Sequence, residues 1–214
     1  MSTAWESPII RVTSGRLNTV NDTYIGGQVS IGSRSRYAGQ LGKHLFVGSE
    51  NIAQMADTTI GDLWAGRYRY VKMRAADDDS PALDIGQLLF WDTTATNWQT
   101  AFQVTRDENL SSTDNAVMIA GVYIGGFEPG NYGFICDLGL VDVVYRSVLT
   151  AAGAPGSRVY AAGTGDTGSD QGTCDVLTTD STSLANARYL GVADETPVAG
   201  AKRRILLNFK PTLI

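Results

Sequence analysis

Residues 117–145 read VMIAGVYIGGFEPGNYGFICDLGLVDVVY, and this stretch decides the fold class. Val117 to Phe127 and Tyr132 to Tyr145 are both rich in β-branched and aromatic residues, the composition of β-strands. The six residues at 127–132, FEPGNY, join the two runs. Proline fixes φ and glycine accepts a positive φ, so this segment predicts a tight turn. The stretch is therefore predicted to be a β-hairpin.

Runs of the same kind recur along the chain, divided by clusters of Gly, Pro, Asn, Asp or Thr. The best helical pattern is Ser49 to Ala56, with Ser49 as its candidate N-cap. The sequence therefore predicts an all-β protein whose body is a β-barrel or a β-sandwich. The other predicted strands are Tyr68–Ala75, Gln87–Trp91, Ala101–Thr105, Arg158–Ala161, Tyr189–Ala193 and Arg203–Phe209.

A spacing of 70 residues recurs in this body. The matched residues are Gly86 and Gly156, Gly121 and Gly191, Gly130 and Gly200, Val122 and Val192, Ile135 and Ile205, and Phe90 and Tyr160. An internal duplication would produce this pattern, with units at 83–150 and 153–210 that each consist of a strand, a polar loop and a Gly-Val hairpin. Two such units would pair into one barrel or sandwich with a shared core. Chance recurrence among the 24 glycines is the alternative.

The first 48 residues differ from the rest of the chain. They are rich in glycine and lack a helical period, yet they carry too many apolar side chains for a solvated linker. They hold five basic and two acidic residues, a net charge of +3, which leaves −8 for the remaining residues out of a total of −5. We therefore expect residues 1–48 to form an extended N-terminal arm on a β-rich body at 49–214. A simple solvated tail is the alternative.

The arm cannot easily build a core of its own, so a neighbouring subunit is expected to cover its apolar side chains. Its arginines are expected to meet acidic groups of the same partner. The residues expected to bind the partner are Trp5, Ile9, Ile10, Arg11, Arg16, Tyr24, Arg34, Arg36 and Tyr37.

Nothing in the sequence points to a catalytic centre. A nucleophilic hydrolase needs a base, and the single histidine, His44, lies in the Gly-rich basic segment without a recognisable partner. Gly163, Gly165 and Gly168 match the dinucleotide-binding spacing, but the loop residues that follow do not predict the required helix. Asp77–Asp79 lack the spacing of a calcium loop and suit a solvated turn better. The sequence therefore predicts a protein that is not an enzyme and has no cofactor or metal.

Two further features have more than one interpretation. Cys136 and Cys174 lack metal-site or redox spacing, so they are either two buried free thiols or a disulfide between adjoining strands. Lys202–Arg204 begin an apolar strand. They are interpreted as a basic strand edge that discourages aggregation, with contact to an acidic partner as the alternative.

The composition also bears on where the protein acts. No stretch approaches the ~20 apolar residues of a membrane span, and Met1 to Glu6 lack the basic-then-apolar order of a secretory signal. We therefore expect synthesis in the cytosol and no membrane partner. Overall acidity argues against nucleic acid as the main ligand, because phosphate binding needs a dense basic surface.

Three strings in the body, GQLLFWD at 86–92, IAGVYI at 119–124 and PGNYGFI at 129–135, carry a resemblance. They are similar to the small head proteins of tailed bacteriophages known as decoration or cement proteins, over about residues 83 to 210. The resemblance implies β-rich domains, often homotrimers, on the outer surface of a capsid that is made in the bacterial cytoplasm. It implies the major capsid protein and further copies of the chain as partners. The arm has no clear match in this family.

The main hypothesis is therefore a structural virion protein that binds and stabilises a phage capsid lattice through its N-terminal arm. A receptor-binding or glycan-binding module of a head fibre or tail, using exposed Tyr and Trp, is the alternative. A small polysaccharide depolymerase is a third and weaker hypothesis.

Overall fold

The computed structural model describes residues 41–42, 44–47, 64–75, 83–94, 102–107, 112–113, 116–125, 127, 129–162, 171–176 and 189–208. Within these ranges every helix or strand element is a β-strand, which confirms the all-β prediction. No helix in the described part of the chain is long and apolar enough to cross a membrane. The strands are β1 (His44–Val47), β2 (Gly66–Met73), β3 (Leu88–Trp91), β4 (Gln103–Thr105), β5 (Ser112–Thr113), β6 (Ala116–Val117), β7 (Ile119–Tyr123), β8 (Tyr132–Val144), β9 (Arg158–Ala161), β10 (Cys174–Val176), β11 (Tyr189–Ala193) and β12 (Lys202–Leu207).

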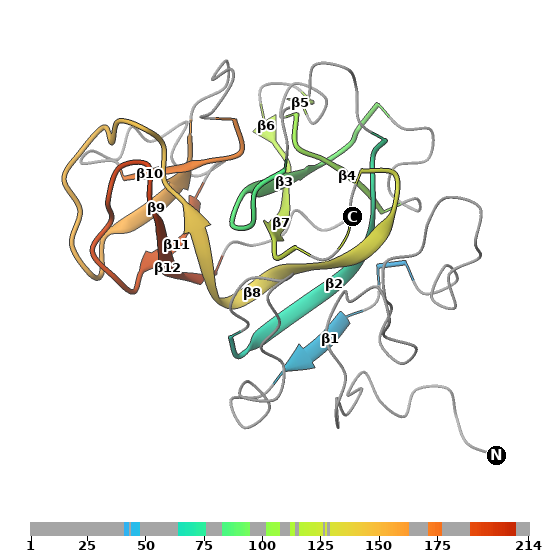
Figure 1. The fold of residues 1–214 in the computed structure, drawn as a ribbon, viewed down its shortest axis with the longest axis horizontal. Helices are drawn as coiled ribbons and strands as arrows, with labels where there is room; N and C mark the ends of the chain where they lie inside the picture. Colours follow the sequence, from blue (N-terminus) through green and yellow to red (C-terminus); the bar gives the residue numbers. More distant parts are fainter. Residues whose placement is uncertain are drawn as a thin grey trace.

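Five of these strands close into a β-barrel in the order β2-β4-β3-β7-β8, with β8 pairing back to β2. The pairing of β2 with β4 is parallel, and the other four pairings are antiparallel. β1 pairs with the first half of β2, at Gly66–Arg69, whereas β4 pairs with its end, at Lys72 and Met73. β5 and β6 form a separate small hairpin. Figure 1 shows this first barrel in teal, green and yellow, with β1 in blue beside β2.

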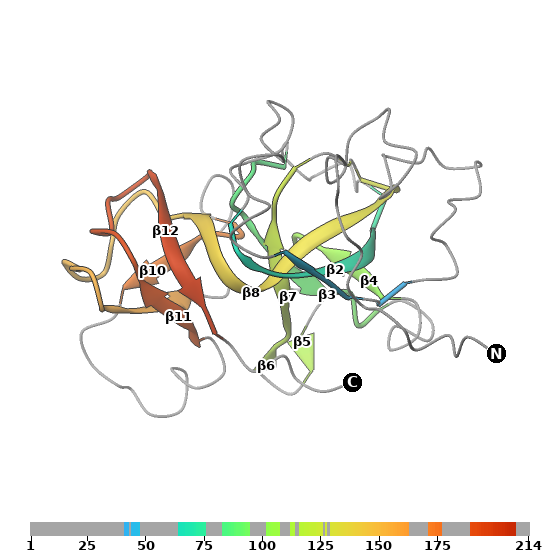
Figure 2. The ribbon, with the colours of Figure 1, turned by 90° about the horizontal axis from the view of Figure 1, so that it is seen from below.

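A second set of strands continues the sheet from β8 in the order β12-β11-β9-β10. A parallel bridge between Tyr145 and Cys174 joins β10 to the residue that follows β8, so these strands also return to their starting strand. β8 has 13 residues, the first half paired with β2 and β7 and the second half with β12. Figures 1 and 2 show β8, in yellow, running from the first lobe into the second, which is drawn in orange and red.

The second set of strands repeats the pairing of the first barrel with a shift of about 70 residues. β9, β10, β11 and β12 take the places of β3, β4, β7 and β8, and the second half of β8 takes the place of β2. Equivalent cross-strand pairs are Leu88–Val122 and Arg158–Val192, Trp91–Val104 and Ala161–Cys174, and Val122–Cys136 and Val192–Leu206. The pattern differs from the expected single barrel or sandwich with a shared core, because each set of strands encloses its own interior and β8 belongs to both.

The recurring glycines have the same backbone roles in the two sets. Gly86 and Gly156 both have a φ near +90°, and their amides donate to the carbonyls of Tyr123 and Ala193, which are also 70 residues apart. Gly130 and Gly200 have φ values of 84° and 68° in the two corresponding hairpin turns. The predicted positive φ at Gly130 is therefore confirmed, but β7 ends at Tyr123 and not at Phe127, so the connection to β8 is longer than the turn predicted at 127–132.

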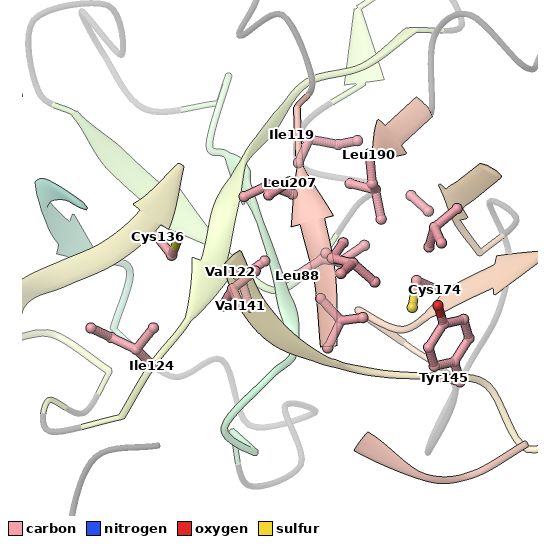
Figure 3. Close-up of a cluster of buried hydrophobic side chains, with 14 of the residues drawn as sticks. Leu88, Ile119, Val122, Ile124, Cys136, Val141, Tyr145, Cys174, Leu190 and Leu207 are labelled. Carbon is pink, nitrogen blue, oxygen red and sulfur yellow. The ribbon is translucent and has the colours of Figure 1, made fainter. Parts of the chain in front are cut away.

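Two groups of buried apolar side chains fill the structure. One lies inside the first barrel and includes Val71, Leu89 and Ile135. The other includes the equivalent residues of the second set, Val143, Val159 and Ile205, and it extends onto side chains of the outer face of the first barrel. Figure 3 shows two of those outer residues, Leu88 and Val122, beside Val141 and Leu207 of the second set.

Backbone hydrogen bonds add to this contact between the two sets of strands. The Val144 amide donates to the Gly86 carbonyl at 3.0 Å, and the Leu88 amide donates to the Gly172 carbonyl at 2.6 Å. The two lobes are therefore joined by a shared strand, by apolar contacts between the second set and the outer face of the first barrel, and by backbone hydrogen bonds.

Gly121 and Gly191 provide a test of the repeated packing. A Cβ atom at Gly121 would meet the carbonyl of Cys136, and one at Gly191 would meet the equivalent carbonyl of Leu206. Backbone cannot move aside cheaply, so we expect Gly121→Ala and Gly191→Ala each to lower the free energy of unfolding by about 2–4 kcal/mol. Gly156→Ala, where a Cβ would meet nothing within 4 Å, is the control. Its strain at positive φ should lower stability by only about 1 kcal/mol in urea denaturation. Equal losses in the three variants would contradict this account.

Candidate functional site

Four charged or titratable side chains gather where β2 begins, and we call His44, Arg67, Arg69 and Asp137 the barrel-end cluster. Arg67 and Arg69 alternate along β2 with Tyr68, so they share a strand face with Val71 of the interior core. Asp137 lies opposite them at an irregularity in the pairing of β8 with β2, where the register shifts between Arg67 and Tyr68. An extra residue of this kind leaves the regular ladder and redirects its side chain.

Asp137 is the centre of the cluster and is fully buried. Arg67 Nε donates to Asp137 Oδ1 at 2.8 Å, and Arg69 Nε donates to Asp137 Oδ2 at 3.1 Å. The side chains of Arg67 and Arg69 retain 21% and 12% of their exposure. The carboxylate is therefore inaccessible to solvent, whereas the two arginine side chains remain partly accessible.

His44 enters the cluster from β1, the strand that pairs with β2. Its Nε2 atom lies 2.9 Å from Arg69 Nε and 3.2 Å from Asp137 Oδ2. Arg69 Nε and Asp137 Oδ2 both lie within hydrogen-bond distance of the same His44 nitrogen, so the three side chains form one hydrogen-bonded network.

The charges of the cluster hold one another in place. Burial opposes ionisation of Asp137, but the hydrogen bonds from His44 and Arg67 and the charge of Arg69 outweigh it, so the pKa of this carboxyl is below its usual value. Burial lowers the pKa of Arg69, and Asp137 acts in the opposite direction. Arg69 also lies over the ring of the buried Trp91, with Cζ 5.5 Å from the ring centroid, a cation–π contact.

This geometry suits the recognition of charge better than proton transfer. In a hydrolytic triad the histidine nitrogen facing the nucleophile has to be available to take its proton. Here His44 Nε2 is already engaged by Arg69 and Asp137. The described residues also contain no group of three His, Cys, Asp or Glu side chains that could hold a metal ion.

Two other buried carboxylates complete hydrogen-bond networks around the barrels. Asp92 accepts from Arg74 Nη1 and Gln103 Nε2, both at 2.8 Å. Asp175 accepts from the backbone amide of Thr150 at 2.9 Å and lies 3.4 Å from Arg146 Nη1. Both connect separate strands and loops, which is a structural role.

The basic residues at the start of β12 have a partner strand on one side. β8 pairs with Lys202–Leu207, whereas β11 pairs only with Ile205–Leu207 on the other side, and the Arg204 carbonyl accepts from the amides of Asp194 and Glu195. Arg204 forms ion pairs with Asp194 at 2.5 Å and Glu195 at 3.2 Å, and its Cζ lies 4.3 Å from the Trp64 ring centroid. This guanidinium therefore binds acidic groups of its own chain.

Both cysteines are free and fully buried, and no disulfide joins them. Cys136 lies in β8 and Cys174 in β10. Burial raises the pKa of each thiol. Figure 3 shows the Cys174 sulfur beside the hydroxyl of Tyr145, inside the second set of strands.

The nine residues predicted to bind a partner, Trp5, Ile9, Ile10, Arg11, Arg16, Tyr24, Arg34, Arg36 and Tyr37, lie outside the described residues. So does the predicted helix at 49–56. Of the barrel-end cluster, only His44 was considered from sequence, and no site was assigned to it. The signal for the two arginines was their alternation in GRYRYVKM, which places them on the face of Val71 and Met73.

Comparison with known proteins assigns no family to the chain. No family model matches it, and no curated protein matches it in sequence.

The lowered pKa of Asp137 predicts a specific pH dependence. A carboxyl with a depressed folded-state pKa stabilises the protein above its unfolded value of about 3.9, and this contribution is lost as the pH falls through the folded value. Asp137→Asn should therefore be less stable than the unmodified chain at pH 7 and lose less stability between pH 7 and pH 3. Urea denaturation at several pH values measures this. Asp84→Asn, at an exposed turn, is the control. Parallel pH profiles for Asp137→Asn and the unmodified chain would refute the prediction.

The buried thiols predict low chemical reactivity in the folded protein. Thiolate is the reactive form, and here both access and ionisation are suppressed. At pH 8 we expect a disulfide reagent to label Cys136 and Cys174 at least about 100-fold more slowly in the native chain than in denaturant. Mass spectrometry of the labelled peptides distinguishes the two sites. Rapid labelling of either cysteine without unfolding would contradict their burial.

Proposed function

We propose that this chain is a structural protein of a phage virion that binds the outside of the capsid lattice and stabilises it. The observation that carries the proposal is the contrast between residues 1–48, apolar and positively charged, and the acidic remainder of the chain. A segment of that composition gains most by ordering on a partner surface. The proposed partners are the major capsid protein and further copies of this chain, as a homotrimer on the outer capsid surface.

The positions of the decoration-protein strings are compatible with this proposal. GQLLFWD covers β3, IAGVYI covers β7, and PGNYGFI forms the turn into β8. All three therefore belong to the first barrel, where they supply core residues and the hairpin turn. The resemblance rests on the framework of that barrel, so it supports the fold of such a protein more strongly than a particular binding residue.

The position of the first barrel also suits an attached N-terminal segment. Gly42 donates from its amide to the carbonyl of Tyr70 at 2.8 Å, and β1 follows directly and pairs with β2. The last residues of the range predicted as an arm thus belong to the sheet. Gly42, which lies two residues after the segment 1–40, is thus bonded to β2, the strand that carries Arg67 and Arg69 of the barrel-end cluster.

Stabilising a shell needs many copies that each contribute a modest interface. Apolar area removed from water contributes about 25 cal/mol per Å² before the ordering entropy is subtracted. When several such contacts act together on one lattice, multivalency raises the overall affinity far above that of each contact. A short apolar arm repeated around a trimer would use this effect.

The arm residues give the decisive test of this proposal. We expect replacement of Trp5, Ile9, Ile10 and Tyr24 by serine in the full-length chain to weaken binding to capsids at least tenfold, because these side chains supply the buried area. Val148→Ser and Val198→Ser remove exposed apolar side chains of the body and serve as matched controls. Co-sedimentation with capsids and electron microscopy of the particles measure the effect.

Deletion of residues 1–40 should give the same loss while the body keeps its β-rich circular dichroism spectrum. Unchanged capsid binding by either arm variant would end the proposal. Absence of capsid binding by the unmodified chain, together with selective binding on a glycan array, would favour the receptor-binding alternative.

A further inference from the structure

We propose that the barrel-end cluster is a binding site for a carboxylate, held by the guanidinium groups of Arg67 and Arg69. The inference goes beyond the proposed function and does not depend on it. It rests on the charge of the cluster, on the hydrogen-bond donors left over, and on a comparison with the second set of strands.

The two arginines of the cluster share one acidic partner among the described residues. Arg67 and Arg69 are both cationic, and Asp137 is the one carboxylate in the described part of the chain with which they form ion pairs. A half-buried charge without a counter-ion is unfavourable, so the site is improved by one further anion. A single carboxylate matches the surplus of one, whereas a doubly charged phosphate would place its second charge near Asp137.

The donors needed to bind that anion are already present. Both arginines bind Asp137 through Nε alone, and their terminal Nη atoms make no hydrogen bond within the described part of the chain. A guanidinium group presents its donors in a planar fork that matches the two oxygens of a carboxylate. Asp137 and the Trp91 ring hold the two guanidinium groups in position, so little side-chain freedom is lost on binding.

The second set of strands shows that this fold does not need charges here. Val141 takes the place of Arg69, Gly139 that of Arg67, and Leu207 that of Asp137. Val141 and Leu207 belong to the apolar core and are almost completely buried. The same part of the fold is thus closed by apolar side chains in one lobe and by an ion cluster in the other. Replacing buried ion pairs by apolar residues is often neutral or stabilising, so stability alone does not account for the cluster.

The single histidine of the chain makes the site observable. His44 is the only histidine in the sequence, and its Nε2 lies 2.9 Å from Arg69. Its ring signals in an NMR spectrum therefore report on the cluster alone. We would titrate the full-length protein at pH 7 with sodium acetate, replacing sodium chloride so that the ionic strength stays constant.

We expect the His44 ring signals to shift saturably with acetate, with a midpoint in the range of about 1–10 mM that suits one charge-assisted contact. Arg67→Gln removes the surplus charge and leaves the Arg69–Asp137 pair, so its midpoint should be at least tenfold higher. The paired substitution Arg69→Val with Asp137→Leu installs the residues of the second lobe and should also abolish the saturable shift. Tryptophan fluorescence shows whether each variant is folded. If the paired variant does not fold, Arg67→Gln alone tests the inference.

A second titration identifies the source of the carboxylate. N-acetyl-glutamate methylamide presents the same group as the side chain of a protein partner. A lower midpoint than that of acetate would assign the site to an acidic side chain, and equal midpoints would assign it to carboxylates in general. A shift that does not saturate, or an unchanged midpoint in Arg67→Gln, would overturn the inference. Capsid binding is measured separately, so failure here leaves the proposed function untouched.

Discussion

The structure depends on the pairing of β8, which serves both lobes. Its first half closes the first barrel against β2, and its second half starts the next set of strands against β12. Alternate residues such as Ile135, Val141 and Val143 are buried in the two cores. A shift of one residue in the register would move all of them to the opposite face of the strand, so the two lobes are fixed together.

Much of the fold was predictable because strand composition and turn chemistry are local properties. Runs such as 132–145 are long and rich in β-branched residues, and the turn at Pro129 and Gly130 needs a positive φ at glycine. β10 was not predicted, because three residues, Cys-Asp-Val, are too few to show a pattern. β1 was included in the arm, because its four residues lie in a Gly-rich sequence and become a strand only by pairing with β2.

The 70-residue recurrence was visible in the sequence, but its consequence was not. Glycines at equal spacing indicate equivalent turns without showing whether the units enclose one core or two. That outcome depends on the closure of β8 with β2, which joins residues about 70 positions apart. The barrel-end cluster was missed for the same reason. Arg67 and Asp137 meet only through this closure, and the extra residue at Asp137 leaves no sequence mark.

The two lobes use different chemistry in equivalent places. Where the second lobe has Val141 and Leu207, the first has Arg69 and Asp137. The acidic residue lies between two arginines, and this keeps it ionised in spite of complete burial. Such a cluster specifies the partner strands through hydrogen bonds with fixed geometry, while an apolar contact tolerates small displacements. At this place the first lobe therefore constrains the relative positions of its strands more tightly than the second lobe does.

The common strand also has a mechanical consequence. Tandem domains usually meet at a flexible linker, which lets each domain turn independently. Here the covalent connection between the lobes is itself a hydrogen-bonded strand, so the molecule has no hinge at that point. A force applied to one lobe is transmitted to the other as shear along the hydrogen bonds of β8. The two lobes therefore move as one rigid body.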